Sequence, residues 1–579
     1  MNIYIQLLRK YLSTQKWRAT LLITLVITSI GLRLANPQFV RFFIDSAESG
    51  RSLDRLLGAA GLFIFVALVR QAIDIASTFV GEQVAWIATN ALRADLAEHC
   101  LKLDMSFHKV NKPGELIERV DGDVNQLAKF FSDLVIRLFT NFLLIIGVVV
   151  LVWQIDWRFG VSFALIVTVG LLIINSLQKL TVPRWGRLRE ADTNLFGYLE
   201  EWLMGSEIIR SSRAEQFIMN RLHMLQRERW LSMRSAMRMN STMRALPSFV
   251  FLLAYIAAHL WGTFLFTNEI LTIGTLYLVF YYIDVIKDPV WEVSRQVQDF
   301  QRAAASVRRI AALFQERPTI HDGAGVDFPD GALSVRFNQV DFHYADEPET
   351  AVLQKIDFTL EPGKVLGLLG RTGSGKSTLS KLIFRFYDVT EGDIKLGGFD
   401  IRDATQSQLR QRIGMVTQEV ELLNSSLRNN LTLFNMSITD EQILETLQLL
   451  GLEEWFNGLA DGLDTYIAST DELSSGEAQL LAFARIFLFD PGLVILDEAS
   501  SRLDPVTELL IEKAIDYLLN GRTAIIIAHR LATVQRADQI MILEKGQITE
   551  HDTRERLLAN PLSQFSQLIK TGLGEGMSA

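Results

Sequence analysis

The sequence GRTGSGKS, at residues 370–377, decides how the second half of this chain folds. It matches the pattern G-x-x-x-x-G-K-[ST], whose glycines let backbone N–H groups approach phosphate oxygens closely. The apolar run VLGLLG leads into the pattern, and the helix-like segment TLSKLIFRF follows it. This order of strand, loop and helix is the context that a phosphate-binding loop needs, and it disfavours a chance glycine-rich turn.

The phosphate-binding loop supplies candidate nucleotide contacts from its backbone and its side chains. Lys376 is placed to reach the β- and γ-phosphates, and Ser377 to bind Mg²⁺. The helix that follows adds the positive end of its dipole to the attraction for phosphate. The predicted nucleotide contacts in this segment are Gly370, Arg371, Thr372, Gly373, Ser374, Gly375, Lys376, Ser377 and Thr378.

Two further apolar runs end in side chains suited to phosphoryl transfer. LVILDEAS, at residues 493–500, reads as a strand that ends in Asp497 and Glu498. Asp497 would hold Mg²⁺, and Glu498 would polarise an attacking water. AIIIAHR, at residues 524–530, reads as a third strand ending at His529. A lone histidine at a strand end is more often structural, so its contact with a γ-phosphate depends on a family resemblance.

Length, charge and cysteine content limit the classes of protein. The 579 residues exceed one domain of roughly 100–200 residues, so two or more domains are expected. The formal net charge is −9 and like charges form no long run, so nucleic-acid binding gains no electrostatic support. Cys100 is the only cysteine, so no intrachain disulfide can form, which suits a reducing cytosol.

Six apolar segments in the first half are candidates for membrane-spanning helices. A helix needs roughly 20 mostly apolar residues to cross about 30 Å of hydrocarbon. Long polar connections follow the second and fourth segments, and short links join the others. We therefore predict an all-α transmembrane domain over residues 1–316. Its six segments run near residues 19–36, 56–79, 134–153, 159–177, 247–266 and 271–286.

The distribution of Lys and Arg predicts the orientation in the membrane. These residues collect at the N-terminus and in the two long connections. Because cytoplasmic loops carry an excess of positive charge, we place all three regions in the cytoplasm. Six spans then return the chain to the cytoplasm. The alternative, a cleaved signal peptide at the first segment, lacks an obvious cleavage site.

Several charged residues lie at membrane depth. Arg70 and Asp74 are four residues apart, so they can pair on one helical face. Arg137 lies in the third segment, and Asp284 and Lys287 lie near the inner end of the sixth. Such charges mark either a substrate pathway or structural pairs and snorkelling side chains, and the structural interpretation is favoured.

The junction between the halves is readable as a change of pattern. Residues 290–314 are polar and helix-prone, which predicts that the sixth helix continues into the cytoplasm. Residues 317–331, rich in Pro, Gly and Asp, are predicted to be a linker. Strand-like and helical runs then alternate, which predicts an α/β P-loop domain over residues 332–579.

These motifs, in this order, resemble the ABC transporter family of exporter type, over nearly the whole chain. The resemblance implies ATP and Mg²⁺ as cofactors. It implies that Tyr344, in VDFHY, stacks on adenine. It also implies that Gln418, in MVTQEV, binds Mg²⁺ together with Ser377 and Asp497.

The resemblance extends to the motifs that complete an ATP site. LSSGE, at residues 473–477, stands where the family has its signature LSGGQ. Asp504 matches the D-loop aspartate, and His529 matches the switch histidine, which with Glu498 forms the implied catalytic set. Residues 113–124 and the stretch around residues 200–215 resemble the cytoplasmic loops whose short helices dock on the ATPase domain. The signature residues implied to contact nucleotide are Ser474, Ser475, Gly476 and Glu477.

The signature departs from the family pattern at two positions. Ser475 stands in place of Gly and Glu477 in place of Gln, which adds bulk and negative charge near a γ-phosphate. In this family the signature contacts the nucleotide held by a second subunit. The resemblance therefore favours a heterodimer with one degenerate site, in which this chain contributes Glu498 to the active site. A homodimer that tolerates LSSGE is the alternative.

The resemblance implies ATP-driven export, with drug, lipid and peptide substrates all open. The half-size fusion and the lack of a targeting sequence favour the cytoplasmic (inner) membrane of a bacterium. Three alternatives belong to other classes. A soluble ABC ATPase is disfavoured by the six apolar segments. An importer is disfavoured because importers usually keep spans and ATPase on separate chains. An ATP-gated channel or regulator on the same scaffold would show ion currents instead of vectorial transport.

Overall fold

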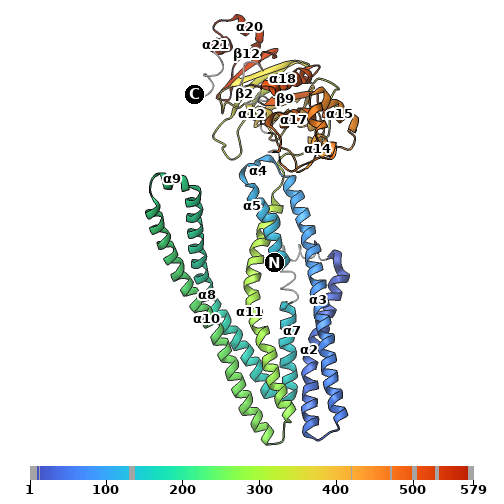
Figure 1. The fold of residues 1–579 in the computed structure, drawn as a ribbon, viewed down its shortest axis with the longest axis vertical. Helices are drawn as coiled ribbons and strands as arrows, with labels where there is room; N and C mark the ends of the chain where they lie inside the picture. The colour runs from blue at the N-terminus through green and yellow to red at the C-terminus, as the bar shows by residue number, and fades with distance from the viewer. Residues whose placement is uncertain are drawn as a thin grey trace. The chain divides into compact units, whose positions relative to one another are not determined.

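The computed structural model describes residues 10–11, 13–129, 137–418, 420–469, 472–497, 505–528 and 534–571. The chain divides into two compact units, one helical and one containing the β-sheets (Figure 1). The first unit comprises Met1–Leu101 and Pro113–Glu316, and the second comprises Lys102–Lys112 and Arg317–Ala579. The short segment Lys102–Lys112 therefore belongs with the sheet-containing unit, although helical segments flank it on both sides.

Six long helices form the described part of the first unit, and each holds most or all of one predicted apolar segment. Four helical stretches are long and apolar enough to cross a membrane: Ser13–Glu48, Leu53–Leu101, Trp157–Met204 and Glu215–Thr267. The six helices are α2 (Lys16–Glu48), α3 (Leu53–Leu101), α7 (Phe139–Ile155), α8 (Trp157–Met204), α10 (Glu215–Thr267) and α11 (Ile273–Gln315). Shorter elements are η1 (Ser13–Gln15), α5 (Pro113–Ile117), η2 (Glu118–Asp123), α6 (Val124–Lys129) and α9 (Ser206–Ser211).

The remaining two long helices differ from these four in length or charge. α7 is a shorter apolar helix of 17 residues. The described residues resume at residue 137, just before it. In α11 the predicted apolar segment contains Asp284, and Lys287 and Asp288 follow it directly. α11 runs unbroken to Gln315, which confirms the predicted continuation of the sixth helix beyond the apolar segment.

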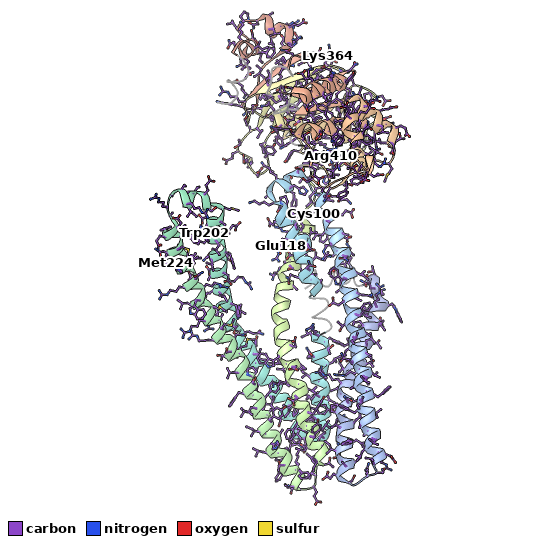
Figure 2. All side chains as sticks on the ribbon, in the orientation of Figure 1. Cys100, Glu118, Trp202, Met224, Lys364 and Arg410 are labelled. Atoms are coloured by element: carbon purple, nitrogen blue, oxygen red, sulfur yellow. The ribbon has the colours of Figure 1, made fainter. Side chains whose placement is uncertain are left out.

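α8 and α10 form a long hairpin that α9 closes at one end (Figure 1). At about 1.5 Å per residue, the 53 residues of α10 span about 80 Å, far more than about 30 Å of hydrocarbon. Polar contacts hold the end distal to the apolar segments, where Tyr198 Oη donates to the Ile218 carbonyl at 3.1 Å and Arg229 Nε to Asp192 Oδ1 at 2.6 Å. Trp202 and Met224 lie in this part of the hairpin (Figure 2).

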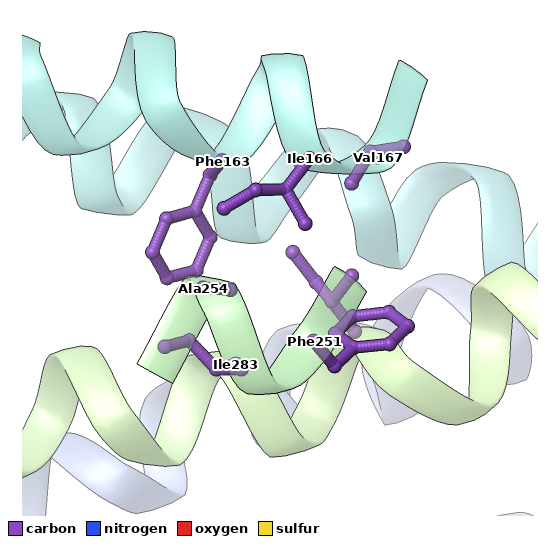
Figure 3. Close-up of a pocket in the computed structure, with 7 residues that line it drawn as sticks. Phe163, Ile166, Val167, Phe251, Ala254 and Ile283 are labelled. Carbon is purple, nitrogen blue, oxygen red and sulfur yellow. The ribbon is translucent and has the colours of Figure 1, made fainter. Parts of the chain in front are cut away.

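Apolar packing holds α8, α10 and α11 together deeper in the unit. A cavity of only about 10 Å³ separates the three helices (Figure 3). Its lining offers no polar group, so a water there would have no hydrogen-bond partner. The lining residues are Phe163, Ile166, Val167, Phe251, Ala254, Ile283 and Ile286.

The second unit is built around a six-stranded sheet in the order β12-β11-β3-β10-β9-β6. The strands β11, β3, β10, β9 and β6 run parallel, and β12 joins the edge antiparallel to β11. Every residue of β3 and β10 is buried, as expected of strands covered on both faces. The strands are β3 (Val365–Gly370), β6 (Ile413–Val416), β9 (Leu493–Asp497), β10 (Thr523–Ile527), β11 (Gln539–Glu544) and β12 (Gln547–Thr553).

Successive residues of the central strands face two separate hydrophobic cores. In β10, Ala524 and Ile526 join the core that contains the helix α17, whereas Ile525 and Ile527 join the core that contains the second sheet. The second, antiparallel sheet has the order β2-β1-β4-β5, and β7 pairs with β8 separately. These strands are β1 (Val335–Phe342), β2 (Leu353–Leu360), β4 (Glu391–Leu396), β5 (Phe399–Asp400), β7 (Ser425–Ser426) and β8 (Tyr466–Ile467).

Helices complete the second unit, and one of them comes from the connection after α3. This helix is α4 (Met105–Val110), within the segment Lys102–Lys112. The others are α12 (Lys376–Ile383), α13 (Gln406–Gln411), α14 (Leu427–Thr432), α15 (Asp440–Leu449), α16 (Glu453–Asn457), η4 (Gly462–Asp464), α17 (Ser475–Phe489), α18 (Pro505–Leu519), α20 (Arg554–Ala559) and α21 (Gln564–Thr571).

Candidate nucleotide-binding site

The register of the parallel strands brings the predicted motifs to one edge of the sheet. Ile527 of β10 lies opposite both Leu368 of β3 and Asp497 of β9. β3 and β9 lie on either side of β10. The strand end that leads into the phosphate-binding loop and the strand end that carries Asp497 are therefore about 10 Å apart. Because the strands are parallel, all of their carboxyl ends open on this edge, which is where ligands bind in sheets of this kind.

Glycines shape the phosphate-binding loop because other side chains would clash or be strained. Gly375 has φ +107°, and a Cβ atom there would lie 2.6 Å from Leu353 Cδ2. A Cβ atom at Gly370 would lie 2.3 Å from the carbonyl oxygen of Leu543. Gly373 also has a positive φ, of +81°, but open space beside it. The loop therefore presents backbone and no side-chain bulk at these positions.

Two side chains of the loop are buried and polar, as an anion site requires. Lys376 is 6% exposed, and its Nζ donates to the carbonyl oxygens of Gly370 at 2.6 Å and Arg371 at 3.1 Å. The Oγ of Ser374 is buried and has no hydrogen-bond partner among the described residues. A buried hydroxyl without a partner fits a ligand oxygen, so the loop fits a phosphate group.

The predicted Mg²⁺ ligands lie around the same edge. Ser377 is exposed in the first turn of α12, and Asp497 is half-buried at the end of β9. Gln418 is exposed two residues after β6 ends. Within the described residues, no cluster of three or more His, Cys, Asp or Glu could hold a metal. Glu498, Asp504 and His529 lie outside the described residues.

Tyr344, the predicted adenine contact, is fixed next to the phosphate-binding loop. Its hydroxyl lies 3.1 Å from Thr378 Oγ1 in α12. Phe342 and Tyr387 pack edge-to-face with it, with ring centroids 5.0 and 5.2 Å away. A cavity of about 340 Å³ opens beside the ring. Its lining residues are Met105, His108, Lys109, Tyr344, Lys381 and Tyr387.

The helix that packs on this site was not found by sequence reasoning. Residues 113–124 resemble a docking loop, but the segment within the second unit is Lys102–Lys112, which carries α4. Lys109 of α4 forms an ion pair with Asp346 at 2.9 Å, and Asp104 accepts a hydrogen bond from Thr319 Oγ1 at 2.7 Å. These partners are more than 200 residues distant in the chain, so no local pattern announces them.

The signature segment begins a helix and is occupied by its own capping box. Ser474 Oγ accepts from the Glu477 N–H at 3.2 Å, and Glu477 Oε2 accepts from Ser474 N–H at 2.8 Å and Oγ at 2.7 Å. Gly476 is required by packing, since a Cβ atom there would lie 2.1 Å from Thr507 Cγ2. Ser475 is exposed beside them. The Glu477 carboxylate is therefore held at the N-terminus of α17.

Arg485 links the signature helix to the segment that follows Gln418, and no sequence motif predicts this link. Its Nε donates to the carbonyl of Asn430 at 2.7 Å, and its Nη1 to the carbonyl of Glu421 at 3.0 Å. Burial lowers the pKa of this guanidinium. Arg485 therefore connects the helix that bears the signature to the residues that follow Gln418.

Comparison with known proteins identifies the family. Residues 353–501 match the ABC transporter family model, and residues 20–289 match that of the ABC transporter transmembrane region. The probable multidrug resistance ABC transporter ATP-binding/permease protein YheH of Bacillus subtilis is 30% identical over 489 residues, 84% of this chain and 72% of that protein. This chain belongs to the ABC transporter family.

Other relatives of the transporter share its layout of fused transmembrane and ATP-binding domains. The ATP-dependent lipid A-core flippase of Syntrophus aciditrophicus is 29% identical, over 93% of this chain and 89% of that protein. A bacterial Atm1-family ABC exporter with ATP bound has the same fold, with a TM-score of 0.79 at 22% identity, covering 98% of this chain and 100% of that one. The transporter is therefore a multi-pass membrane protein of exporter fold that binds and hydrolyses ATP.

Replacing Gly375 by Ala tests whether the space at this glycine is needed for Mg-ATP binding, apart from its effect on the stability of the fold. Gly375→Ala adds a side chain at φ +107° and drives it against Leu353. Gly398→Ala is the matched control, since φ is +90° there and the space is open. Gly398→Ala should lose about 1–2 kcal/mol of stability in thermal unfolding and Gly375→Ala at least as much, but only Gly375→Ala should lose Mg-ATP binding in calorimetry. Equal ATP affinity in the two variants would contradict the account of the loop.

Proposed function

We propose that the transporter exports an amphipathic substrate bearing a cationic group, as one subunit of a heterodimer in the bacterial cytoplasmic membrane. One observation carries this proposal: a loop that fits phosphate is joined, in a single chain, to a membrane unit whose helices enclose a charged cavity. The Lys- and Arg-rich connections support placing the ATPase in the cytoplasm.

Each motif has a proposed role in ATP hydrolysis. Lys376 and the loop N–H groups would bind the phosphates, and Tyr344 the adenine. Ser377, Asp497 and Gln418 would hold Mg²⁺, which neutralises charge on the phosphate oxygens when bound. Glu498, directly after Asp497, would polarise the attacking water, and His529, after β10, would contact the γ-phosphate. Asp504 would act at the partner interface.

ATP would drive transport by binding one conformation better than another. Two nucleotides held between a phosphate-binding loop and the opposite signature would favour closed ATPase domains. A ligand shifts such an equilibrium only by its differential affinity for the two states. Hydrolysis at Glu498 removes that preference and resets the cavity. α4 and α9 are the cytoplasmic elements proposed to transmit closure to the helices.

The charged cavity of the membrane unit is the candidate substrate site. It has a volume of about 350 Å³, within the range of small-molecule sites, and lies among α2, α3, α7 and α11. Its charged lining residues are Arg33, Asp74, Arg137, Asp288 and Glu292, and its polar residues include Ser29, Ser77, Thr78, Thr140 and Asn141.

Two positive and three negative side chains give this cavity an excess of negative charge, so a ligand with a cationic group complements it. Relatives named for lipid A-core and multidrug transport support an amphipathic cargo.

The predicted pair of Arg70 with Asp74 is wrong. Asp74 faces α2, where it accepts a hydrogen bond from Ser29 Oγ. Arg70 Nε is buried with no hydrogen-bond partner among the described residues.

The capping box of the signature supports the heterodimer. The Ser474 hydroxyl donates to the Glu477 carboxylate, so it would not donate to a phosphate in the same geometry. The carboxylate also places negative charge where the helix N-terminus would otherwise attract an anion. This signature would therefore face the weaker site, whereas Lys376, Asp497 and Glu498 of the same chain would serve the active one.

The variant Glu498→Gln is expected to abolish most ATP turnover because it removes the group that polarises water, while Mg-ATP binding stays unchanged. Phosphate release from the transporter with its partner subunit in proteoliposomes measures turnover. Glu512→Gln, a partly exposed carboxylate beside Arg536, is the control. Near-normal hydrolysis by Glu498→Gln would remove Glu498 from the mechanism.

Restoring the family signature tests the heterodimer. The double change Ser475→Gly and Glu477→Gln removes the carboxylate from the α17 N-terminus. It is expected to raise the ATPase rate of the purified chain alone by about tenfold or more, since a like charge near phosphate costs several kcal/mol. Glu472→Gln, just outside the signature, should change little. A wild-type chain that is already as active alone as the double variant would point to a homodimer.

Charge removal in the membrane cavity tests the substrate class. Asp288→Asn keeps the shape of the cavity and is expected to weaken ATPase stimulation by the cationic dye rhodamine 123 about tenfold, the worth of one charge-assisted contact. Asp284→Asn, on the same helix but not lining the cavity, is the control. Stimulation by a neutral dye that exceeds that by rhodamine 123 in the wild type would refute the proposed substrate class.

A further inference from the structure

A lysine of α4 covers the ring of Tyr344. Lys109 Nζ lies 4.0 Å from the ring centroid, well within the range of a cation–π interaction. The same Nζ lies 2.9 and 3.0 Å from the two carboxylate oxygens of Asp346, two residues after Tyr344. This hydrogen bond raises the pKa of Lys109 and lowers that of Asp346, so both remain charged at neutral pH.

Residues from outside α4 hold the rest of the Tyr344 ring in place. Thr378 binds its hydroxyl, and Phe342 and Tyr387 pack against it at right angles. The ring therefore has little freedom to turn and offer a different surface. Lys109 and Tyr344 both line the cavity of about 340 Å³, so free volume lies beside the ring that Lys109 covers.

A base and an ammonium group compete for one aromatic face. Stacking of a base requires ring planes in contact, which leaves no room for an Nζ atom above the centroid. The cavity is next to α12, whose N-terminus begins at the phosphate-binding loop, so a nucleotide held by the loop can reach it. Lys109 is partly exposed, with 39% of its side chain accessible, and can swing aside without disturbing a core.

We propose that Lys109 is a latch on the adenine site, displaced from Tyr344 when the base of ATP stacks there. The inference rests on the proposed role of Tyr344 in nucleotide binding. Displacing Lys109 from the ring uses part of the ATP binding energy. By thermodynamic reciprocity, a bound base weakens the contact of Lys109 with Tyr344 by the same factor, and with it the attachment of α4. Because α4 lies in the connection between α3 and α5, base occupancy is signalled to the chain that enters the helical unit.

The test compares two ligands that share a triphosphate chain, of which only ATP carries a nucleoside with its base. Mg-ATP and Mg-tripolyphosphate binding are measured by calorimetry on the full-length chain in nanodiscs. Lys109→Met keeps the length of the side chain and removes its charge. It should tighten ATP binding about two- to fivefold, the worth of an exposed cation–π contact, and leave tripolyphosphate binding unchanged. Lys109→Arg, which preserves the contact, should behave as wild type.

Lys112→Met, in the same segment but outside the cavity, controls for the loss of a lysine. Unchanged or weaker ATP binding by Lys109→Met would overturn the latch. An equal shift for ATP and tripolyphosphate would also overturn it, because the effect would then be one of general charge. If the wild type binds tripolyphosphate but gains nothing from the base, the role of Tyr344 fails. If it binds neither ligand, the proposed function itself fails.

Discussion

The alignment of β3, β10 and β9 is the constraint on which the ATP site depends. Parallel pairing places Leu368, Ile527 and Asp497 at one level, so the phosphate-binding loop and the acidic strand end open on the same edge. A slip of one residue would reverse which core each side chain of β10 enters, because neighbouring residues alternate between two cores. Burial of these strands therefore determines where the phosphate-binding loop and Asp497 lie relative to each other.

Much of this arrangement was readable from the sequence because it is local. The phosphate-binding loop, the strand LVILD and the apolar helices are each encoded within about 20 neighbouring residues, where period and glycine placement decide the conformation. The structure places the loop, Asp497 and Gln418 around one edge as expected. Glu498, Asp504 and His529 are assigned from sequence motifs alone, and their roles remain predictions.

The features that sequence reasoning missed are all long-range. Asp74 contacts Ser29 on another helix in place of Arg70 on its own, because helix packing decides which neighbour is nearer. Arg33, Asp288 and Glu292 join the cavity without any shared motif. Lys109 and Asp346 meet across more than 200 residues of chain. Periodicity tells which face of a helix is apolar but not which residues of other elements lie opposite it.

The membership of Lys102–Lys112 in the second unit bears on how the ATPase can be isolated. A fragment cut at Arg317, where the chain enters that unit for good, would leave α4 behind. It would lose the partner of Asp346 and expose the aromatic face that Lys109 covers. The severed domain would thus be a different nucleotide binder from the one in the intact protein, and its affinities would not transfer to the parent chain.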